Sequence, residues 1–281
     1  MIPTTFDYQR ATSVEDALQK LAGGGKLLAG GHSLIPLMKL RLSEPGTLID
    51  IARIPGLAGV RERDGLIEIG AATVHHDVAT SALLREACPA LAETAAEIGD
   101  PQVRNRGTVG GSLAHADPAA DYPAIMLALD AQIDIRGPQG ARTVAAANFF
   151  QDLFTVDLAA NEMIVAVRVA PLRSAAYAKL HQRASHFAIV GVAAALAVSN
   201  GKIASARIGL TGAGPVAARL TAVEQALAGQ PATTESIAAA AAKAADGLGE
   251  LNSDIHASQD YRRAMIGVFT RRALDSALGR V

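Results

Sequence analysis

Three glycines and two hydroxyl residues are concentrated in a short stretch before the middle of the chain. They are Gly107, Thr108, Gly110, Gly111 and Ser112. Glycine lets the backbone turn sharply or approach another group closely, and main-chain N–H groups together with hydroxyls can bind phosphate oxygens. The stretch therefore predicts a pyrophosphate site. A tight strand-to-helix connection that binds nothing explains these residues equally well, because glycine pairs are common in turns.

A second stretch, Leu27–Pro36, has a related layout. Apolar residues typical of a strand lead into Gly30 and Gly31, and Ser33 then stands at a position where it could cap a helix. A helix that begins after such a turn offers an anion site at its N-terminus. Two loops of this kind predict a ligand with two phosphates. Neither fits G-x-G-x-x-G or G-x-x-x-x-G-K-[ST], which disfavours both a Rossmann dinucleotide site and a P-loop.

Residues that could act as acids, bases or metal ligands do not form a recognisable catalytic set. His75 and His76 are adjacent, and adjacent side chains of a helix diverge by about 100°, so they are not expected to share a metal. His115 and Asp117 could serve general base catalysis, but we expect them to shape the glycine loop or to contact a partner subunit. Ser33 lacks the G-x-S-x-G context of a nucleophile. We predict no catalytic residue and no metal ligand in this chain.

The composition is that of an ordinary globular protein. Of 281 residues, 50% are apolar and 19% charged, and 26 Lys and Arg balance 27 Asp and Glu, so nucleic acid is not an expected partner. The apolar runs are shorter than the roughly 20 residues of a membrane span. The first residues lack the pattern of a signal peptide, and we expect a cytoplasmic protein. The single cysteine, Cys88, excludes a disulfide framework and an iron–sulfur cluster held by this chain alone.

Hydrophobic periodicity and turn residues predict the elements that position these motifs. In the first half they are a helix from Ser13 to Gly23, a buried strand at 26–29, a helix at 33–41, a strand at 47–51, a hairpin at 59–69 turning at Asp64 and Gly65, two helices between 74 and 98 separated near Pro89, a helix at 119–129, and strands at 132–136 and 162–169. Beyond a boundary at 171–175 they are three antiparallel strands at 176–182, 189–199 and 203–211, with a turn at Asn200 and Gly201, and helices at 217–227, 234–245 and 261–278.

The segments Ala29-Gly-Gly-His-Ser33 and Thr108-Val-Gly-Gly-Ser112 resemble motifs of the FAD-binding medium subunits of molybdenum hydroxylases, the xanthine dehydrogenase family. They are most similar to its aerobic carbon monoxide dehydrogenase branch, and the resemblance covers nearly the whole chain. It implies an α+β fold. Residues 1–172 would form a two-lobed FAD-binding domain of the vanillyl-alcohol oxidase type, with lobes at about 1–55 and 56–172 and FAD between them. Residues 173–281 would form a C-terminal domain with a three-stranded antiparallel sheet and helices.

The resemblance also implies which residues hold the cofactor. The two motifs would hold the pyrophosphate, Asp121 would accept hydrogen bonds from ribose hydroxyls, and Ile164 would lie near the isoalloxazine. Phe187 would lie against the flavin ring at a position where the family often has tyrosine. The full set implied is Leu27, Leu28, Ala29, Gly30, Gly31, His32, Ser33, Leu34, Ile98, Thr108, Val109, Gly110, Gly111, Ser112, Asp121, Ile164, Lys179 and Phe187.

Three residues beside the motifs keep two interpretations each. His32 would either orient its loop or contact the flavin. Arg104 and Arg106 would either neutralise phosphate or pair with surface carboxylates, and the sequence does not separate these roles.

The family assignment implies a subunit of a larger enzyme. Substrate would be oxidised at a molybdenum centre on a large subunit, and electrons would cross two [2Fe–2S] clusters of a small subunit to FAD and then reach an external acceptor, within a dimer of heterotrimers. The segment 179–192 and the loop after His115 are the predicted docking face for the small subunit. Two alternatives are a self-contained FAD-dependent alcohol oxidase of the vanillyl-alcohol type and a nucleotide-binding scaffold without redox use. The substrate is not predicted.

Overall fold

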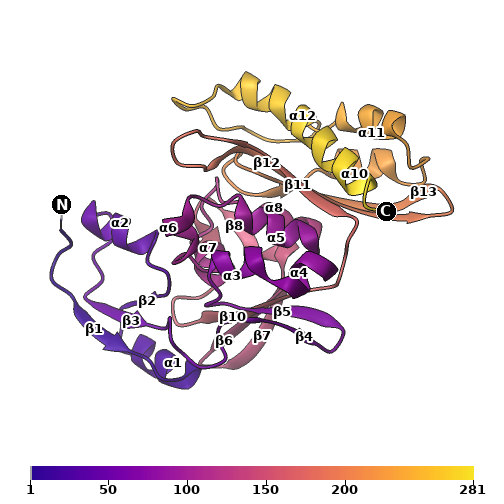
Figure 1. Cartoon of the computed structure of the whole chain (residues 1–281). Helices are drawn as coiled ribbons and strands as arrows, with labels where there is room; N and C mark the ends of the chain where they lie inside the picture. The colour runs from indigo at the N-terminus through magenta and orange to yellow at the C-terminus, as the bar shows by residue number, and fades with distance from the viewer. Residues whose placement is uncertain (1) are drawn as a thin grey trace.

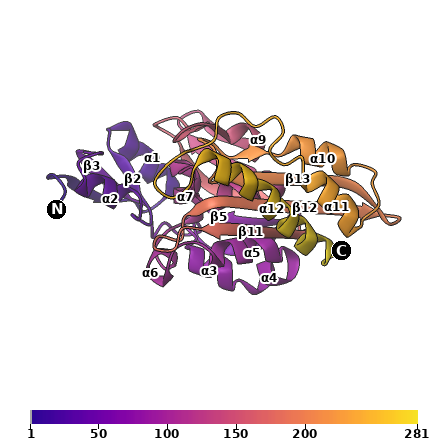
Figure 2. The ribbon, with the colours of Figure 1, turned by 90° about the horizontal axis from the view of Figure 1, so that it is seen from above.

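The chain is organised around three main β-sheets, one in each of three consecutive parts (Figures 1 and 2). The structure is a computed structural model, and it describes residues 2–281. The first part lies at one end of the molecule, the second forms the middle, and the sheet of the third lies across the second. Within the described residues, every helix is too short or too polar to span a bilayer.

The first part, or first lobe, is a three-stranded parallel sheet with two helices. Its central strand β3 (Thr47–Asp50) lies between β1 (Asp7–Arg10) and β2 (Lys26–Leu28). Helix α1 (Val14–Ala22) precedes β2, and α2 (Leu34–Lys39) follows it. The sequence predicts all of these except β1, whose side chains are all exposed and so show no buried alternation. The prediction that β2 is buried is wrong, because it is an edge strand whose side chains are exposed or half-buried.

The second part, or second lobe, is built on an antiparallel sheet of five strands in the order β4-β5-β10-β6-β7. Their bounds are β4 (Val60–Arg63), β5 (Leu66–Gly70), β6 (Gln132–Gly137), β7 (Gly140–Ala145) and β10 (Met163–Val169), and a small hairpin of β8 (Phe150–Asp152) and β9 (Thr155–Val156) lies beside them. The hairpin predicted at 59–69 is confirmed. Asp64 and Gly65 both have positive φ, as the two-residue turn that links twisted strands requires.

Helices cover one face of this sheet (Figure 1). They are α3 (His75–Thr80), α4 (Ala82–Ala87), α5 (Pro89–Ala96), α6 (Pro101–Arg104), α7 (Val109–His115), α8 (Tyr122–Ala128) and α9 (Ala146–Phe149). The break near Pro89 is confirmed. The prediction of only two helices between 74 and 98 is wrong, because Ser81 leaves the helical conformation and its hydroxyl caps α4 by accepting the Leu84 N–H at 3.3 Å.

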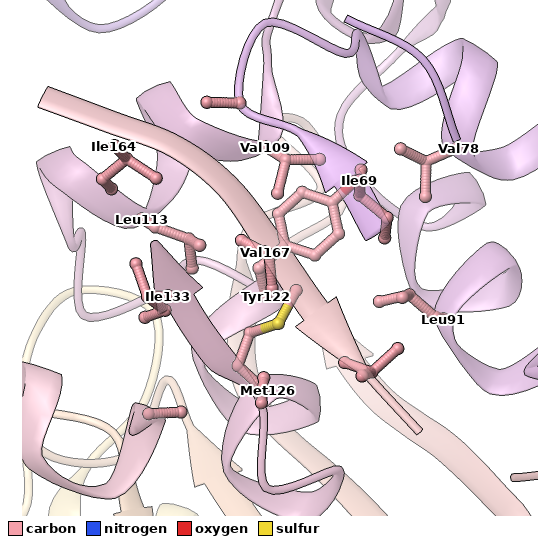
Figure 3. Close-up of a cluster of buried hydrophobic side chains, with 14 of the residues drawn as sticks. Ile69, Val78, Leu91, Val109, Leu113, Tyr122, Met126, Ile133, Ile164 and Val167 are labelled. Carbon is pink, nitrogen blue, oxygen red and sulfur yellow. The ribbon is translucent and has the colours of Figure 1, made fainter. Parts of the chain in front are cut away.

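The core of the second lobe lies between the sheet and these helices (Figure 3). Ile69 and Val167 reach it from the sheet, and Leu91, Leu113 and Met126 reach it from the helices, all fully buried. Burying these side chains removes a large apolar area from water, and each Å² of that area stabilises the fold by about 25 cal/mol. The packed core therefore fixes the positions of the segments at the edge of the lobe, among them the start of α7 and of β10.

The third part is an antiparallel sheet covered by helices on its outer face (Figure 1). The three predicted strands are found as β11 (Ala175–His181), β12 (Ala188–Ser199) and β13 (Lys202–Thr211). A two-residue strand, β14 (Ala218–Arg219), adds a fourth strand at the β13 edge, and this pairing delays the start of α10 (Thr221–Leu227). Helices α11 (Thr234–Ala241) and α12 (Gln259–Leu278) complete the chain.

The inner face of this sheet packs on α5 and α8 of the second lobe. At Gly209 the approach is so close that an added Cβ would lie 2.1 Å from the Ala124 carbonyl oxygen. The Thr211 hydroxyl lies 3.0 Å from the Pro118 oxygen and 2.7 Å from the Ala120 oxygen. The third part thus fixes the loop that precedes α8. Residues 170–174 connect β10 to β11, where the sequence predicts a boundary, and the division of the chain into domains there stays a prediction.

Candidate functional site

A cleft of about 420 Å³ lies where the three parts meet. Most of the residues that the resemblance implies line it, and they come from β2, the loop to α2, the segments around α6 and α7, β10 and the β11–β12 connection. Those that line the cleft are Leu27, Leu28, Ala29, Gly30, Gly31, His32, Ser33, Leu34, Ile98, Thr108, Gly110, Gly111, Ser112, Asp121, Ile164 and Phe187. The fold therefore brings together two motifs that are about 75 residues apart in the chain.

The two glycine motifs touch each other directly. An added Cβ at Gly30 would lie 2.2 Å from the carbonyl oxygen of Arg106 and 2.8 Å from the Cα of Gly107. An added Cβ at Gly107 would lie 2.6 Å from Nε2 of His75. Contacts this short leave no room for a side chain at either position. Backbone packs on backbone here, and that close approach joins the first lobe to the second.

The second motif is a helix N-terminus, not an open loop. Thr108 is the N-cap of α7, and its hydroxyl accepts the Gly111 N–H at 3.1 Å. The N–H groups of Val109 and Gly110 donate to the Thr73 and Ala71 carbonyls at 3.0 and 2.8 Å. The expectation that this backbone offers its N–H groups to phosphate is therefore corrected for these three residues. What remains for a ligand is the N–H of Thr108, which has no acceptor among the described residues, the positive end of the helix dipole and the hydroxyl groups.

The glycines of this motif serve close packing and not a left-handed turn. Gly110 and Gly111 both have negative φ, as helical residues. An added Cβ at Gly110 would lie 2.6 Å from the Ala71 Cβ, and one at Gly111 would lie 2.8 Å from the Thr108 hydroxyl oxygen. The sharp turn expected from the sequence is thus replaced by a helix that starts directly against β5.

The first motif has the open backbone that the second lacks. Gly31 has a φ of 75°, and the N–H groups of Gly31, His32 and Ser33 have no acceptor among the residues that the structure describes. Ser33 stands at the N-cap position of α2, but its hydroxyl caps nothing, contrary to the prediction. Unpaired N–H groups at the wall of a cleft fit the acceptor oxygens of a phosphate.

Asp121 forms a buried ion pair at the cleft wall. Its Oδ1 lies 2.8 Å from the Lys179 ammonium and accepts the Tyr177 hydroxyl at 2.6 Å. The side chains of Asp121 and Lys179 are 4% and 1% exposed. Lys179 also donates to the Glu97 carbonyl at 2.7 Å. Burial raises the pKa of Asp121, and the ammonium and the hydroxyl act in the opposite direction.

This pair changes how two predicted residues are interpreted. Oδ1 of Asp121 already accepts from Lys179 and Tyr177, so Oδ2 is the oxygen left to accept a ribose hydroxyl. Lys179 does not line the cleft itself but stands behind Asp121. Val109 does not line it either, because its side chain is fully buried in the core (Figure 3). That these three take part in cofactor binding stays a prediction.

His75 is a buried residue of the cleft that the sequence does not assign to the site. It lines the cleft and is 4% exposed, and its Nδ1 is enclosed without a hydrogen-bond partner in the described part of the chain. Burial, and to a smaller extent the nearby His32 and Arg104, lower the pKa of His75 to about 4. The spacing of His75 and Val78, three positions apart on the buried face of α3, could have identified His75 as buried, but not as a residue of the cleft.

The remaining polar candidates shape the cleft. Arg104 has no carboxylate partner among the described residues, and its Nη1 donates to the Ile98 and Gly99 carbonyls at 3.0 and 2.8 Å. That it neutralises phosphate stays a prediction. Asp117 accepts the Ala119 N–H at 2.8 Å and so forms the loop after α7, as expected. His32 lies 3.3 Å from the Gly30 carbonyl oxygen through Nδ1, which fits the loop-orienting role. Arg106 is exposed.

Comparisons with known proteins match the whole chain. A family model described as the FAD binding domain in molybdopterin dehydrogenase matches residues 4–172, and one described as the CO dehydrogenase flavoprotein C-terminal domain matches residues 175–277. The carbon monoxide dehydrogenase medium chain of Hydrogenophaga pseudoflava is 42% identical over 100% of this chain and 99% of its own. A subunit of the 6-hydroxypseudooxynicotine dehydrogenase complex of Paenarthrobacter nicotinovorans is 42% identical over 100% of this chain and 97% of its own.

Solved structures agree. A chain of the H. pseudoflava carbon monoxide dehydrogenase gives a TM-score of 0.95 at 43% identity and covers 100% of this chain and 99% of its own. A chain of quinoline 2-oxidoreductase from Pseudomonas putida 86 gives 0.93 at 32% identity and covers 99% of both. These matches confirm the two-domain α+β flavoprotein fold and FAD as the cofactor.

The contact at Gly30 predicts a specific loss of FAD. In Gly30→Ala the new Cβ would collide with the Arg106 carbonyl and push the first motif away from the second lobe. Overpacking of this kind costs about 1–3 kcal/mol. We expect FAD affinity, measured by flavin fluorescence titration, to fall at least about tenfold. Gly46→Ala is the matched control in the same lobe, since nothing lies within 4 Å of its added Cβ. Equal affinity in both variants would show that this contact does not form the site.

The buried pair predicts coupling between Asp121 and Lys179. Asp121→Ala leaves a buried ammonium without its partner, and Lys179→Met leaves a buried carboxylate, each costing about 3–5 kcal/mol of unfolding free energy. The double variant should lose less than the sum, with a coupling of about 0.5–3 kcal/mol. Urea unfolding of the four apoproteins measures this. Strictly additive losses would contradict the ion pair.

The pKa of His75 predicts a pH dependence of stability. It is near 6.5 in the unfolded chain and about 4 in the fold, so between these values the unfolded chain binds more protons. The free energy of unfolding therefore falls as the pH falls from 6.5 to 4, by about 3 kcal/mol in all. We expect apoprotein unfolding at pH 7 and 4.5 to show a smaller loss for His75→Gln than for wild type. His76→Gln, at an exposed position, should lose as much as wild type.

Proposed function

This chain belongs to the FAD-binding medium subunits of carbon monoxide dehydrogenase-type molybdenum hydroxylases, and from that premise we propose that it passes electrons from the [2Fe–2S] clusters of a small subunit through FAD to an external acceptor. Oxidation of the substrate would then take place on a large molybdenum subunit, in a dimer of heterotrimers. The observation that carries this proposal is the cleft between the lobes. Its two glycine motifs provide open N–H groups and a helix N-terminus for the pyrophosphate.

The cleft fits FAD by its chemistry. The first motif would hold the pyrophosphate through its N–H groups, and the dipole of α7 and the hydroxyls of Thr108 and Ser112 would face it from the second lobe. Ile164 and Phe187 would hold the flavin ring at the other end. When bound, FAD supplies a ring that takes up and releases two electrons, and the protein positions it and tunes its potential.

The metal-ligating side chains of this chain support a proposal that the other redox centres lie on partner subunits. The sole cysteine, Cys88, is buried, and burial raises its thiol pKa to about 11. A cysteine that ligates a cluster must be a thiolate. Among residues 2–281 no three His, Cys, Asp or Glu side chains are grouped as a metal site would require. We therefore assign the clusters and the molybdenum to partner subunits.

The residues that select the substrate would lie outside this chain. Two relatives at 42% identity carry names that refer to different substrates, carbon monoxide and 6-hydroxypseudooxynicotine. The chain is thus equally similar to subunits that serve different chemistry. We propose a carbon monoxide dehydrogenase-like complex as the first assembly to test.

Exposed aromatic residues at the mouth of the cleft support the proposed docking face. Phe187, in the β11–β12 connection, is 48% exposed, and Phe154, at the tip of the β8–β9 hairpin, is 52% exposed. The Phe154 ring lies 5.1 Å from the His115 ring, which lines the cleft. Large exposed aromatics are enriched where proteins meet. Within the predicted face 179–192, Lys179, Val190 and Val192 are buried, so that prediction is narrowed. We propose that the small subunit docks over the exposed stretch 181–187 and the loop after His115.

The proposed function predicts that the isolated chain is yellow but incomplete. Purified alone, it should show flavin absorption and no oxidation of carbon monoxide or heterocycles. Co-expression with a large molybdenum subunit and a cysteine-rich small one should give turnover and equimolar co-purification, with a native mass that tests the dimer of heterotrimers. Turnover of an organic substrate by the lone chain, at about 1–10³ per second, would instead establish a self-contained oxidase. A colourless protein that does not bind added FAD would favour the alternative of a nucleotide-binding scaffold without redox use.

A further inference from the structure

The ring of His75 is almost wholly buried, and its two nitrogens have different surroundings. Its Nδ1 is shut off from solvent without a partner among the described residues. Its Nε2 edge faces Gly107, where an added Cβ would lie 2.6 Å away, and the residue lines the cleft. The Tyr122 ring packs beside it, with centroids 5.3 Å apart. Only Nε2 is therefore in a position to reach a ligand.

Burial also determines which nitrogen carries the proton. The imidazole is neutral at pH 7, because burial lowers its pKa to about 4. A neutral ring has one N–H, and an orphaned buried N–H is rarer in proteins than an orphaned acceptor. The proton is therefore placed on Nε2, and the Nδ1 lone pair faces the core. His75 offers the cleft an uncharged donor.

This donor stands where the two glycine motifs meet. Gly107, which Nε2 faces, also lies against Gly30 of the first motif. The unpaired N–H groups of Gly31, His32 and Ser33 follow directly in the chain. The Nε2–H of His75 and these N–H groups are all hydrogen-bond donors. Together they favour a ligand group that only accepts hydrogen bonds, such as a phosphate oxygen. The α7 N–H groups, already paired, leave a gap in the second lobe that Nε2 can fill.

We propose that His75 is a cofactor-binding residue whose Nε2–H donates a hydrogen bond to a pyrophosphate oxygen of FAD. The inference rests on the proposed placement of FAD in the cleft. It assigns to the second lobe a side-chain donor in place of backbone N–H groups. It also gives the adjacent histidines different roles, since His76 is exposed and does not line the cleft.

Two isosteric variants test which nitrogen matters. The amide nitrogen of His75→Gln reaches the position of Nε2, whereas that of His75→Asn reaches only that of Nδ1. We expect FAD affinity of His75→Gln within about threefold of wild type, and that of His75→Asn at least about tenfold weaker, as for a lost hydrogen bond to a charged group. His76→Asn is the matched control and should bind like wild type. Melting of each apoprotein shows whether it folds.

Nitrogen-15 NMR of wild-type protein labelled in histidine gives an answer that does not depend on folding of the variants. The apoprotein should show His75 protonated on Nε2, and that resonance should move on addition of FAD and also of ADP, which carries the pyrophosphate without the flavin. A proton on Nδ1, or a resonance that ADP leaves unmoved, would overturn the proposal. So would wild-type affinity in His75→Asn. If both His75→Asn and Gly30→Ala keep wild-type FAD affinity, the proposed placement of FAD in the cleft is wrong. If Gly30→Ala loses FAD while His75→Asn keeps it, only the proposed role of His75 is wrong.

Discussion

Backbone packed directly on backbone holds the first lobe to the second at the cofactor cleft. Gly30 of the first lobe lies against the backbone of Arg106 and Gly107 at distances that exclude any Cβ at Gly30. A side chain at Gly30 would widen the gap between the lobes, and the pyrophosphate groups would lose the two sides that face each other. Gly110 of the second motif also permits close packing, because it lets α7 start against Ala71 within the second lobe. The width of the cleft is therefore set by the absence of side chains.

Charge is balanced at the wall where the third part meets the cleft. A lone carboxylate at Asp121 would repel the phosphates of FAD, and its burial would be unfavourable. Lys179 and Tyr177 reach it from β11, and Lys179 also ties down the end of α5 through the Glu97 carbonyl. The third part thus neutralises the wall and fixes the loop before α8. This arrangement explains why a strand far from the glycine motifs in sequence belongs to the site.

The two motifs have different parts in the proposed site, although their sequences are alike. The first provides open N–H groups after β2, and the second provides a capped helix whose own N–H groups are used within the fold. The uncharged donor of His75 completes the second side. Both sides therefore present donors to a doubly charged group, and the aromatic residues at the mouth leave the flavin end accessible to partner subunits.

The sequence by itself determined much about this protein. Local patterns predicted the hairpin at Asp64 and Gly65, the strands β3, β10 and β11 to β13, and most helices, because each depends on periodicity or turn chemistry within a few residues. The motifs and their resemblance predicted the family, the FAD cofactor and a residue set of which the fold gathers all but Val109 and Lys179 in one cleft. Only the tertiary structure decided that β2 is an edge strand, that α7 uses its own N–H groups, that Asp121 is paired with Lys179, and that His75 faces the cleft while His76 does not. Each of these depends on which distant segment packs against the residue, and that is fixed by long-range contacts that no local pattern records.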